Sequence, residues 1–165
     1  MTSTIPYVTH LLAVAALVGE NGGAEELMIA ALLHDAMEDQ GVGRDEIAGR
    51  FGERVASVVE SCSDTTVKPK PPWRERKEKY IAHLRGAHSD VRLVSLADKI
   101  HNARSILSDL QRDGPGVWGR FNAGPQEILW YYRSVLQVLR DGWDHPLISQ
   151  LEQVVQEIEH IVSRH

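Results

Sequence analysis

The chain has 165 residues, of which 42% are hydrophobic and 25% are charged, and its formal net charge is -5. These values are typical of one globular domain, and the negative charge gives no overall attraction to nucleic acid polymers or anionic membranes. Cys62 is the only cysteine, which excludes an intramolecular disulfide, and no apolar run approaches the roughly 20 residues that span a bilayer. We therefore expect a cytoplasmic protein that binds any anionic substrate through a metal ion or a local group of cations.

Apolar residues recur with helical periodicity along most of the chain, and no run shows the alternation typical of a strand. The basic, proline-rich stretch at about 62–73 (CSDTTVKPKPPW) predicts a loop, and Gly114-Pro115-Gly116 predicts a second break. The sequence thus predicts an all-α fold, with residues 1–165 as a single helical domain. Helices are expected at 11–18, 24–37, 44–51, 52–61, 73–85, 90–107, 126–140 and 146–162.

The last predicted helix carries an apolar stripe that runs from Leu147 to Val162. Such a stripe packs either against the chain's own core or against a second copy of the chain. A homodimer is therefore one alternative for the assembly.

The stretch AALLHDAMEDQG, residues 30–41, ends a strongly apolar helix on two adjacent ligand-type residues, His34 and Asp35. A carboxylate at the end of a buried helix needs a cation or hydrogen-bond donors, because burying an unpaired charge is costly. Glu38 and Asp39 follow at i+4 spacing, which in a continuous helix brings them to the same face. A solvated helix end is the alternative interpretation of this acidic pair. The stretch indicates a metal site, and imidazole with carboxylate suits Mn, Fe, Zn or Mg.

Two further residues have the same character. His10 lies near the start of an apolar helix in PYVTHLLAVAAL, and Asp98 lies in VRLVSLADKIHNARSIL. Taken singly, His10 could be a helix-terminal residue, and Asp98 could form a surface ion pair with Lys99. These ligand-type residues belong to different predicted helices, as ligands do in metal sites inside helical bundles. Their combination favours a metal centre.

Together, the blocks PYVTH, AALLHDAMEDQ and LADKIHNARS resemble the HD superfamily of metal-dependent phosphohydrolases, in which His, His-Asp and Asp occur in this order. More narrowly, they look like the hydrolase domain of the RelA/SpoT group and the small stand-alone alarmone hydrolases related to the metazoan SpoT homologue. The resemblance extends from about residue 6 to about residue 132. It implies an HD-type helical domain with a metal site between helices, which removes the 3'-pyrophosphate from guanosine tetra- or pentaphosphate.

The resemblance also implies roles for single residues. Glu38 and Asp39 match an acidic pair that orients or activates the attacking water, and Asn102 matches a residue that contacts the nucleotide. Lys99 and Arg104 lie in the family's basic stretch beside it. The residues that match the family's metal ligands, which usually hold Mn(II), are His10, His34, Asp35 and Asp98.

Further cations could stabilise the leaving pyrophosphate from the basic loop and the helix after it. Arg120 and Tyr131, later in the chain, are weaker candidates for the same pocket. A solvated charged face is the alternative for the basic cluster, and the aromatic residues near the C-terminus could equally fill the core. The basic candidates are Lys68, Lys70, Arg74 and Lys77.

One departure from the family keeps other functions open. Family members usually carry a basic Arg-Lys stretch before the PYxxH block that contacts the guanine base, whereas this sequence begins five residues before Pro6. This departure favours, as an alternative, an HD phosphohydrolase of another nucleoside mono- or triphosphate. A non-catalytic nucleotide-binding domain is the second alternative, although such a domain has no need of a water-activating acid.

Overall fold

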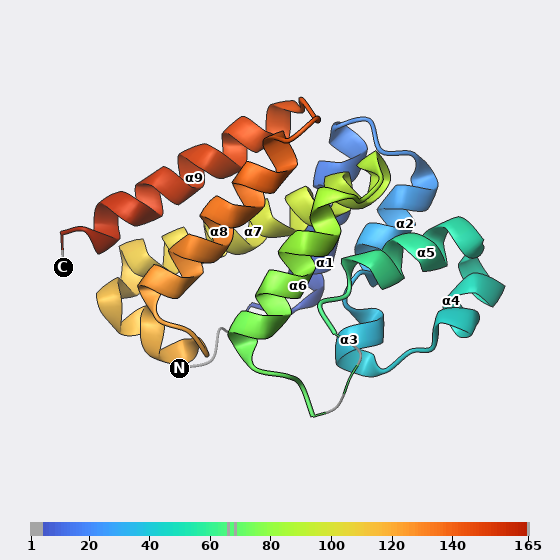
Figure 1. The fold of residues 1–165 in the computed structure, drawn as a ribbon, viewed down its shortest axis with the longest axis horizontal. Coiled ribbons are helices and arrows are strands. Elements are labelled where there is room, and N and C mark those ends of the chain that lie inside the picture. Colours follow the sequence, from blue (N-terminus) through green and yellow to red (C-terminus); the bar gives the residue numbers. More distant parts are fainter. Residues whose placement is uncertain (1–4, 66, 68, 165) are drawn as a thin grey trace. The chain divides into compact units, whose positions relative to one another are not determined.

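The computed structural model describes residues 5–65, 67 and 69–164, and its elements are drawn in Figure 1. Over these residues the chain is built from helices, without a strand, as the sequence predicts. The elements are α1 (Val8–Glu20), α2 (Glu25–Leu33), α3 (Ala36–Gln40), α4 (Arg44–Phe51), α5 (Glu53–Cys62), α6 (Trp73–Arg85), α7 (Ser89–Asp113), the 3₁₀ helix η1 (Gly114–Arg120), α8 (Pro125–Arg140) and α9 (Pro146–Val162).

The helices form two compact units. Unit 1 lies within residues 1–70 and 87–98, and unit 2 lies within residues 71–86 and 99–165. The division falls inside α7, whose first ten residues, Ser89 to Asp98, belong to unit 1. The single domain expected from the sequence stays a prediction.

In unit 1, α2 packs against both α1 and α5, and α4 packs against α5 (Figure 1). The apolar positions of these helices provide the core, because each helix turns one face inward. Ile47 of α4 and Val55 of α5 are 1% exposed, so even the short helices are anchored by fully buried side chains. The buried residues of α1 and α2 are His10, Val14, Ala15, Val18, Leu27, Ala30 and Ala31.

In unit 2, α8 packs against α6 and α9, and a short turn joins α8 to α9 (Figure 1). The apolar stripe of α9 is buried inside this unit, so it packs against the chain's own core. A homodimer stays a prediction, but this stripe no longer supports it. His145 caps α9, since its Nδ1 accepts a hydrogen bond from the Leu147 amide at 3.3 Å. The buried residues of α9 are Leu147, Ile148, Leu151, Val154, Val155 and Ile158.

The predicted helix at 24–37 is wrong in one respect that matters for function. α2 ends at Leu33, and α3 begins only at Ala36. Asp35 has φ -98° and ψ -1°, a turn conformation that redirects the chain. The i+4 argument that placed Glu38 beside His34 therefore does not apply across this break. α3 itself ends at Gly41, whose φ of 67° favours glycine.

Other boundaries differ less. α1 begins at Val8 rather than residue 11, and α7 continues to Asp113 rather than 107 before Gly114 ends it with a φ of 68°. The described residues between α5 and α6 form the predicted loop. Lys68, a predicted substrate contact in that loop, lies outside the described residues. None of the described helices is long and apolar enough to cross a membrane.

Candidate metal centre

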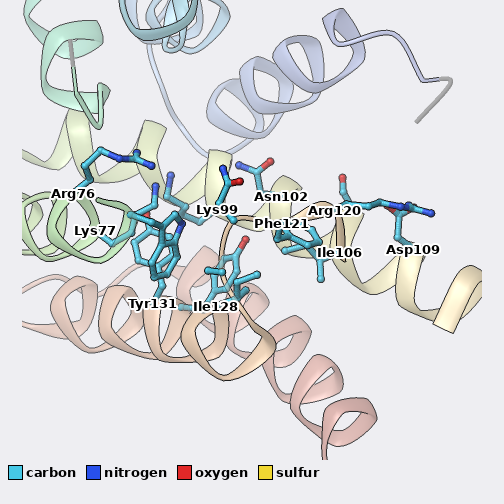
Figure 2. Close-up of a pocket in the computed structure, with 15 residues that line it drawn as sticks. Arg76, Lys77, Lys99, Asn102, Ile106, Asp109, Arg120, Phe121, Ile128 and Tyr131 are labelled. Carbon is cyan, nitrogen blue, oxygen red and sulfur yellow. The ribbon is translucent and has the colours of Figure 1, made fainter. Parts of the chain in front are cut away.

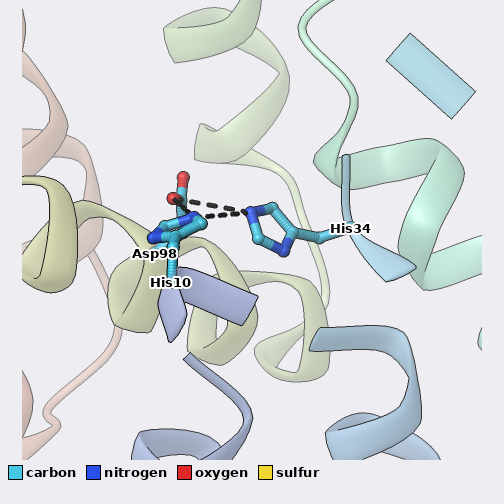
Figure 3. A group of neighbouring side chains, drawn as sticks. All are labelled: His10, His34 and Asp98. Carbon is cyan, nitrogen blue, oxygen red and sulfur yellow. Dashed lines mark hydrogen bonds and ion pairs between the residues drawn. The ribbon is translucent and has the colours of Figure 1, made fainter. Parts of the chain in front are cut away.

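Three predicted ligands come together in the interior of unit 1. His10 lies in the first turn of α1, His34 follows the end of α2, and Asp98 lies on α7. Their side chains point toward one another in Figure 3. His10 is 8% exposed, His34 3% and Asp98 7%, so the three polar groups are almost completely removed from water. A buried polar cluster of this kind needs a counter-charge or a full set of hydrogen bonds.

The separations between the ligand atoms suit a divalent cation. His10 Nε2 lies 3.3 Å from His34 Nε2 and 3.3 Å from Asp98 Oδ1, and His34 Nε2 lies 3.5 Å from Asp98 Oδ1. Ligand atoms that are each about 2.1 Å from one ion are separated by roughly 3.0–3.4 Å for octahedral or tetrahedral angles. The three donors therefore fit one small ion, with nitrogen and oxygen ligands that suit Mn, Fe or Zn.

A backbone contact orients His34 for this task. Its Nδ1 lies 2.7 Å from the carbonyl oxygen of Ala31, one turn earlier in the chain. Since a carbonyl can only accept, Nδ1–H donates, and Nε2 is the nitrogen left to face the other ligands. Metal-binding histidines in proteins are commonly fixed in this way.

Asp35 lies at the edge of the same cluster. Its Oδ2 is 3.3 Å from His34 Nε2, and its side chain is 30% exposed, in contrast to the buried three. The Tyr7 hydroxyl donates a hydrogen bond to this Oδ2. The structure thus places Asp35 where a fourth ligand would be expected, on the more open side of the cluster.

The cluster attracts positive charge. Burial lowers the pKa of the His34 imidazole, but hydrogen bonds and charge from Asp35 and Asp98 outweigh this effect and raise it to about 10. Burial disfavours ionised Asp35, yet the hydrogen bond and charge of His34, followed by the Tyr7 hydroxyl, lower its pKa below the usual value. Burial and the bond to Asp35 raise the pKa of Tyr7, which stays a donor. A proton on His34 Nε2 therefore occupies the position that a cation would take.

This proton gives the metal-free protein a characteristic pH dependence. Because the pKa of His34 is about 10 in the folded chain and about 6.5 when unfolded, its contribution to stability is complete below about pH 6.5. We expect that contribution to be lost as the pH rises to about 10. Thermal unfolding of metal-stripped protein should show a falling Tm over this window, with a smaller fall in Asp98→Asn. A Tm that stays constant or rises over this pH window would contradict the prediction.

The acidic pair on α3 is held by the loop that follows α5. Glu38 Oε1 lies 2.7 Å from Lys70 Nζ, and Glu38 Oε2 accepts a hydrogen bond from the Asp64 amide at 3.1 Å. Asp39 Oδ1 lies 3.6 Å from the same Lys70 nitrogen. The Glu38 side chain is 14% exposed and that of Asp39 45%, so Glu38 is the more firmly positioned of the two. The Glu38 and Asp39 carboxylates raise the pKa of Lys70.

Replacing Lys70 tests whether this contact positions Glu38. Lys70→Ala should lower kcat by about tenfold, in the range of a misplaced acid–base group, with unchanged Mn(II) affinity. The ammonium is 40% exposed, so its ion pair contributes at most about 1 kcal/mol, and the Tm should change little. Lys79→Ala, which removes an exposed ion pair within α6, is the matched control. Equal activity in both variants would remove Lys70 from the site.

A pocket of about 430 Å³ lies in unit 2, and Figure 2 shows several of its residues. Four cations and four aromatic rings share its lining, a combination that suits the phosphates and base of a nucleotide. Among the predicted contacts, Lys77, Lys99, Asn102, Arg120 and Tyr131 line it. The remaining lining residues are Trp73, Arg76, Ser105, Ile106, Asp109, Phe121, Asn122, Ala123, Ile128 and Tyr132.

Two predicted substrate contacts are engaged elsewhere in unit 2. The Arg74 guanidinium lies 3.2 Å from the centre of the Trp130 ring and pairs with Glu78 at 2.8 Å. Arg104 donates to Gln150 Oε1 at 3.0 Å, and it is not among the residues that line the pocket. Their roles toward a substrate stay predictions.

Comparison with known proteins gives the family. A model of the HD domain matches residues 1–129, which include all four predicted ligands and the acidic pair. The chain belongs to the HD domain family. A 3'-pyrophosphohydrolase of guanosine-3',5'-bis(diphosphate), MESH1 of Xenopus tropicalis, is 32% identical over 152 residues, covering 88% of this chain and 81% of that protein.

Solved structures of HD-type relatives agree in fold. The crystal structure of lmo0812 from Listeria monocytogenes EGD-e has a TM-score of 0.82 and 30% identity, and the match covers 90% of this chain and 97% of that one. A structure described as a metazoan ortholog of SpoT that hydrolyses ppGpp has a TM-score of 0.74 and 26% identity, with 92% and 81% covered. The all-α HD fold predicted from the sequence is therefore confirmed.

Sequence reasoning missed three features of this HD site. It did not find the Tyr7 hydroxyl, the Ala31 carbonyl or the Asp64 amide. Lys70, a predicted substrate contact, binds Glu38 in the structure, and its role toward a substrate stays a prediction. Tyr7 could have been noticed, because it lies three residues before His10, directly before the helix that carries this ligand. The two backbone contacts leave no signal in the sequence.

Proposed function

We propose that the chain is a metal-dependent hydrolase that removes the 3'-pyrophosphate from guanosine tetra- or pentaphosphate. The observation that carries the proposal is the buried cluster of His10, His34 and Asp98, whose donor atoms are spaced for one cation in a chain of the HD domain family. The proposed substrate is the one that the name of the similar MESH1 proteins gives, guanosine-3',5'-bis(diphosphate).

In this proposal His10, His34, Asp35 and Asp98 hold a divalent ion, Mn(II) by our interpretation. When bound, such an ion polarises a phosphoryl oxygen and lowers the pKa of a bound water. Asp35 completes the ligand set from the open side, where its carboxylate is partly exposed. His10, His34 and Asp98 are buried, so the partly exposed side at Asp35 is the proposed side of substrate approach.

Glu38 is the proposed general base. Its carboxylate accepts the proton of the attacking water, while Lys70 and the Asp64 amide keep its two oxygens in place. Water then adds to the 3'-phosphorus and the bond from that phosphorus to the ribose 3'-oxygen breaks. The proton taken up by Glu38 passes to that oxygen, so the products are pyrophosphate and a nucleotide with a free 3'-hydroxyl. Asp39, more exposed and farther from Lys70, has the lesser part in this proposal.

Within unit 2, we assign Lys77, Lys99 and Asn102 to the anionic and ribose groups of the nucleotide, because all three line the pocket of that unit. These local cations explain how a chain with a net charge of -5 could bind a highly anionic substrate. A cytoplasmic location is part of the proposal.

A panel of nucleotides with Mn(II) tests the proposal most directly. Guanosine 3',5'-bis(diphosphate) should yield guanosine 5'-diphosphate and pyrophosphate, which ion-exchange chromatography separates from phosphate. Release of phosphate from another nucleotide, without pyrophosphate release from the guanosine compound, would favour the alternative substrate class. No turnover of any nucleotide, despite stoichiometric metal, would favour a binding domain.

A further inference from the structure

We infer that Tyr7 is a positioning residue for the metal site, and that it acts by fixing the carboxylate of Asp35. The inference rests on the proposed function in one respect, since it takes the cluster of His10, His34 and Asp98 to be a cation site. Tyr7 is not among the site residues that the sequence predicts. It is carried by the side-chain contacts of Tyr7 in unit 1.

Tyr7 touches two ligands from one position. Its hydroxyl donates a hydrogen bond to Asp35 Oδ2, across 28 residues of sequence. Its ring lies against the ring of His10, with 5.4 Å between the ring centres. The residue directly precedes α1, so the ligand His10 and the donor to Asp35 lie three residues apart at the start of this helix. One tyrosine thereby joins the start of α1 to the turn between α2 and α3.

Asp35 needs such a contact more than the other ligands do. His34 is fixed by the Ala31 carbonyl and by burial, and Asp98 is 7% exposed. The Asp35 side chain is 30% exposed and lies in a turn outside both α2 and α3. A carboxylate at a helix end can rotate freely, whereas one whose oxygen accepts a hydrogen bond has a single preferred orientation. Outer contacts of this kind orient ligands in many metal sites.

The position of Tyr7 also makes its role separable from folding. The residue is 53% exposed, so removing its hydroxyl leaves no buried cavity. Tyr7→Phe keeps the ring that lies against His10 and removes only the donor to Asp35. Metal affinity and fold stability should therefore respond differently to this substitution.

The test is a titration of metal-free protein with Mn(II). Binding is monitored by calorimetry and by the electron paramagnetic resonance signal of free Mn(II). Tyr7→Phe should raise the Kd about 10- to 100-fold, the usual effect of losing an outer contact. The matched control is Thr9→Val, which removes a nearby hydroxyl; this hydroxyl donates to the Pro6 carbonyl at 2.7 Å. Its Kd should equal that of the original protein.

A double substitution shows whether Tyr7 acts through Asp35. If it does, Tyr7→Phe should have no further effect on the Kd in the Asp35→Asn background. A Kd for Tyr7→Phe within twofold of the original would overturn the inference, as would an equal loss in Thr9→Val or a full additional loss in the double variant. Failure of the unaltered protein to bind Mn(II) would instead overturn the proposed function. Circular dichroism of each metal-free variant verifies that it is folded.

Discussion

Asp98→Asn should lower the affinity for Mn(II) by at least about a hundredfold, beyond the range seen when only an outer contact is lost. The substitution keeps the shape of the side chain but replaces a charged ligand that lies 3.3 Å from His10 Nε2 and 3.5 Å from His34 Nε2. Hydrolysis at a fixed, limiting Mn(II) concentration should fall by the same factor, because the proposed mechanism requires the ion for turnover. Metal analysis after dialysis and initial rates measure the two effects.

Asp90→Asn is the matched control for this substitution. Asp90 lies on the same helix and in the same unit, but it pairs with Arg54 at 2.9 Å rather than with a predicted ligand. It should bind Mn(II) as the original chain does. A normal metal content in Asp98→Asn would show that the ion, if any, binds elsewhere.

Glu38→Gln should separate metal binding from catalysis. The amide keeps the size of the side chain and cannot accept the proton of water, so we expect kcat to fall by about 10²–10⁴-fold. Mn(II) affinity should stay within about twofold, since the Glu38 carboxylate is bound by Lys70 and the Asp64 amide and is not one of the predicted metal ligands. Single-turnover rates with saturating Mn(II) measure the loss.

Two further variants show whether the loss is specific. Asp39→Asn should cost less than Glu38→Gln, because the Asp39 side chain is 45% exposed and lies 3.6 Å from the Lys70 ammonium, whereas Glu38 lies 2.7 Å from it. Glu46→Gln removes a surface carboxylate on α4 that pairs with Arg50, and it should leave the rate unchanged. A greater loss in Asp39→Asn than in Glu38→Gln would exchange the roles of the two acids.

The sequence predicts the helices well because apolar residues recur at helical spacing and mark the buried faces. It fails at the end of α2, where Ala30, Ala31, Leu32 and Leu33 lead without a glycine or proline into His34. None of these four residues favours a turn, so the sequence predicts a continuous helix there. It also ends α7 early, because Asp109 to Asp113 is largely polar and only Gly114 stops the helix.

The cluster of His10, His34 and Asp98 could be predicted because such residues are unusual in a core, while their role as metal ligands stays a prediction. A histidine and an aspartate next to an apolar run are hard to explain by packing alone. The contacts that hold them could not be predicted. A tyrosine hydroxyl, a lysine ammonium or a backbone amide can donate a hydrogen bond to many acceptors, and the folded structure determines which acceptor lies close enough. Lys70 is an example, since its charge suggested a phosphate and its nearest partner is Glu38.

His10, His34 and Asp98 come from three segments that are far apart in the sequence: the first turn of α1, the turn after α2, and α7. An ion shared by them would therefore cross-link the chain, closing two large loops as disulfides do in other proteins. This chain has a single cysteine and so cannot form an internal disulfide. Chelation would then have two effects. It would remove the Lewis acid, and it would release the start of α1 from the turn after α2 and from α7. Activity regained at once on adding Mn(II) would reflect the first effect, and a slow return would reflect re-formation of the helical packing.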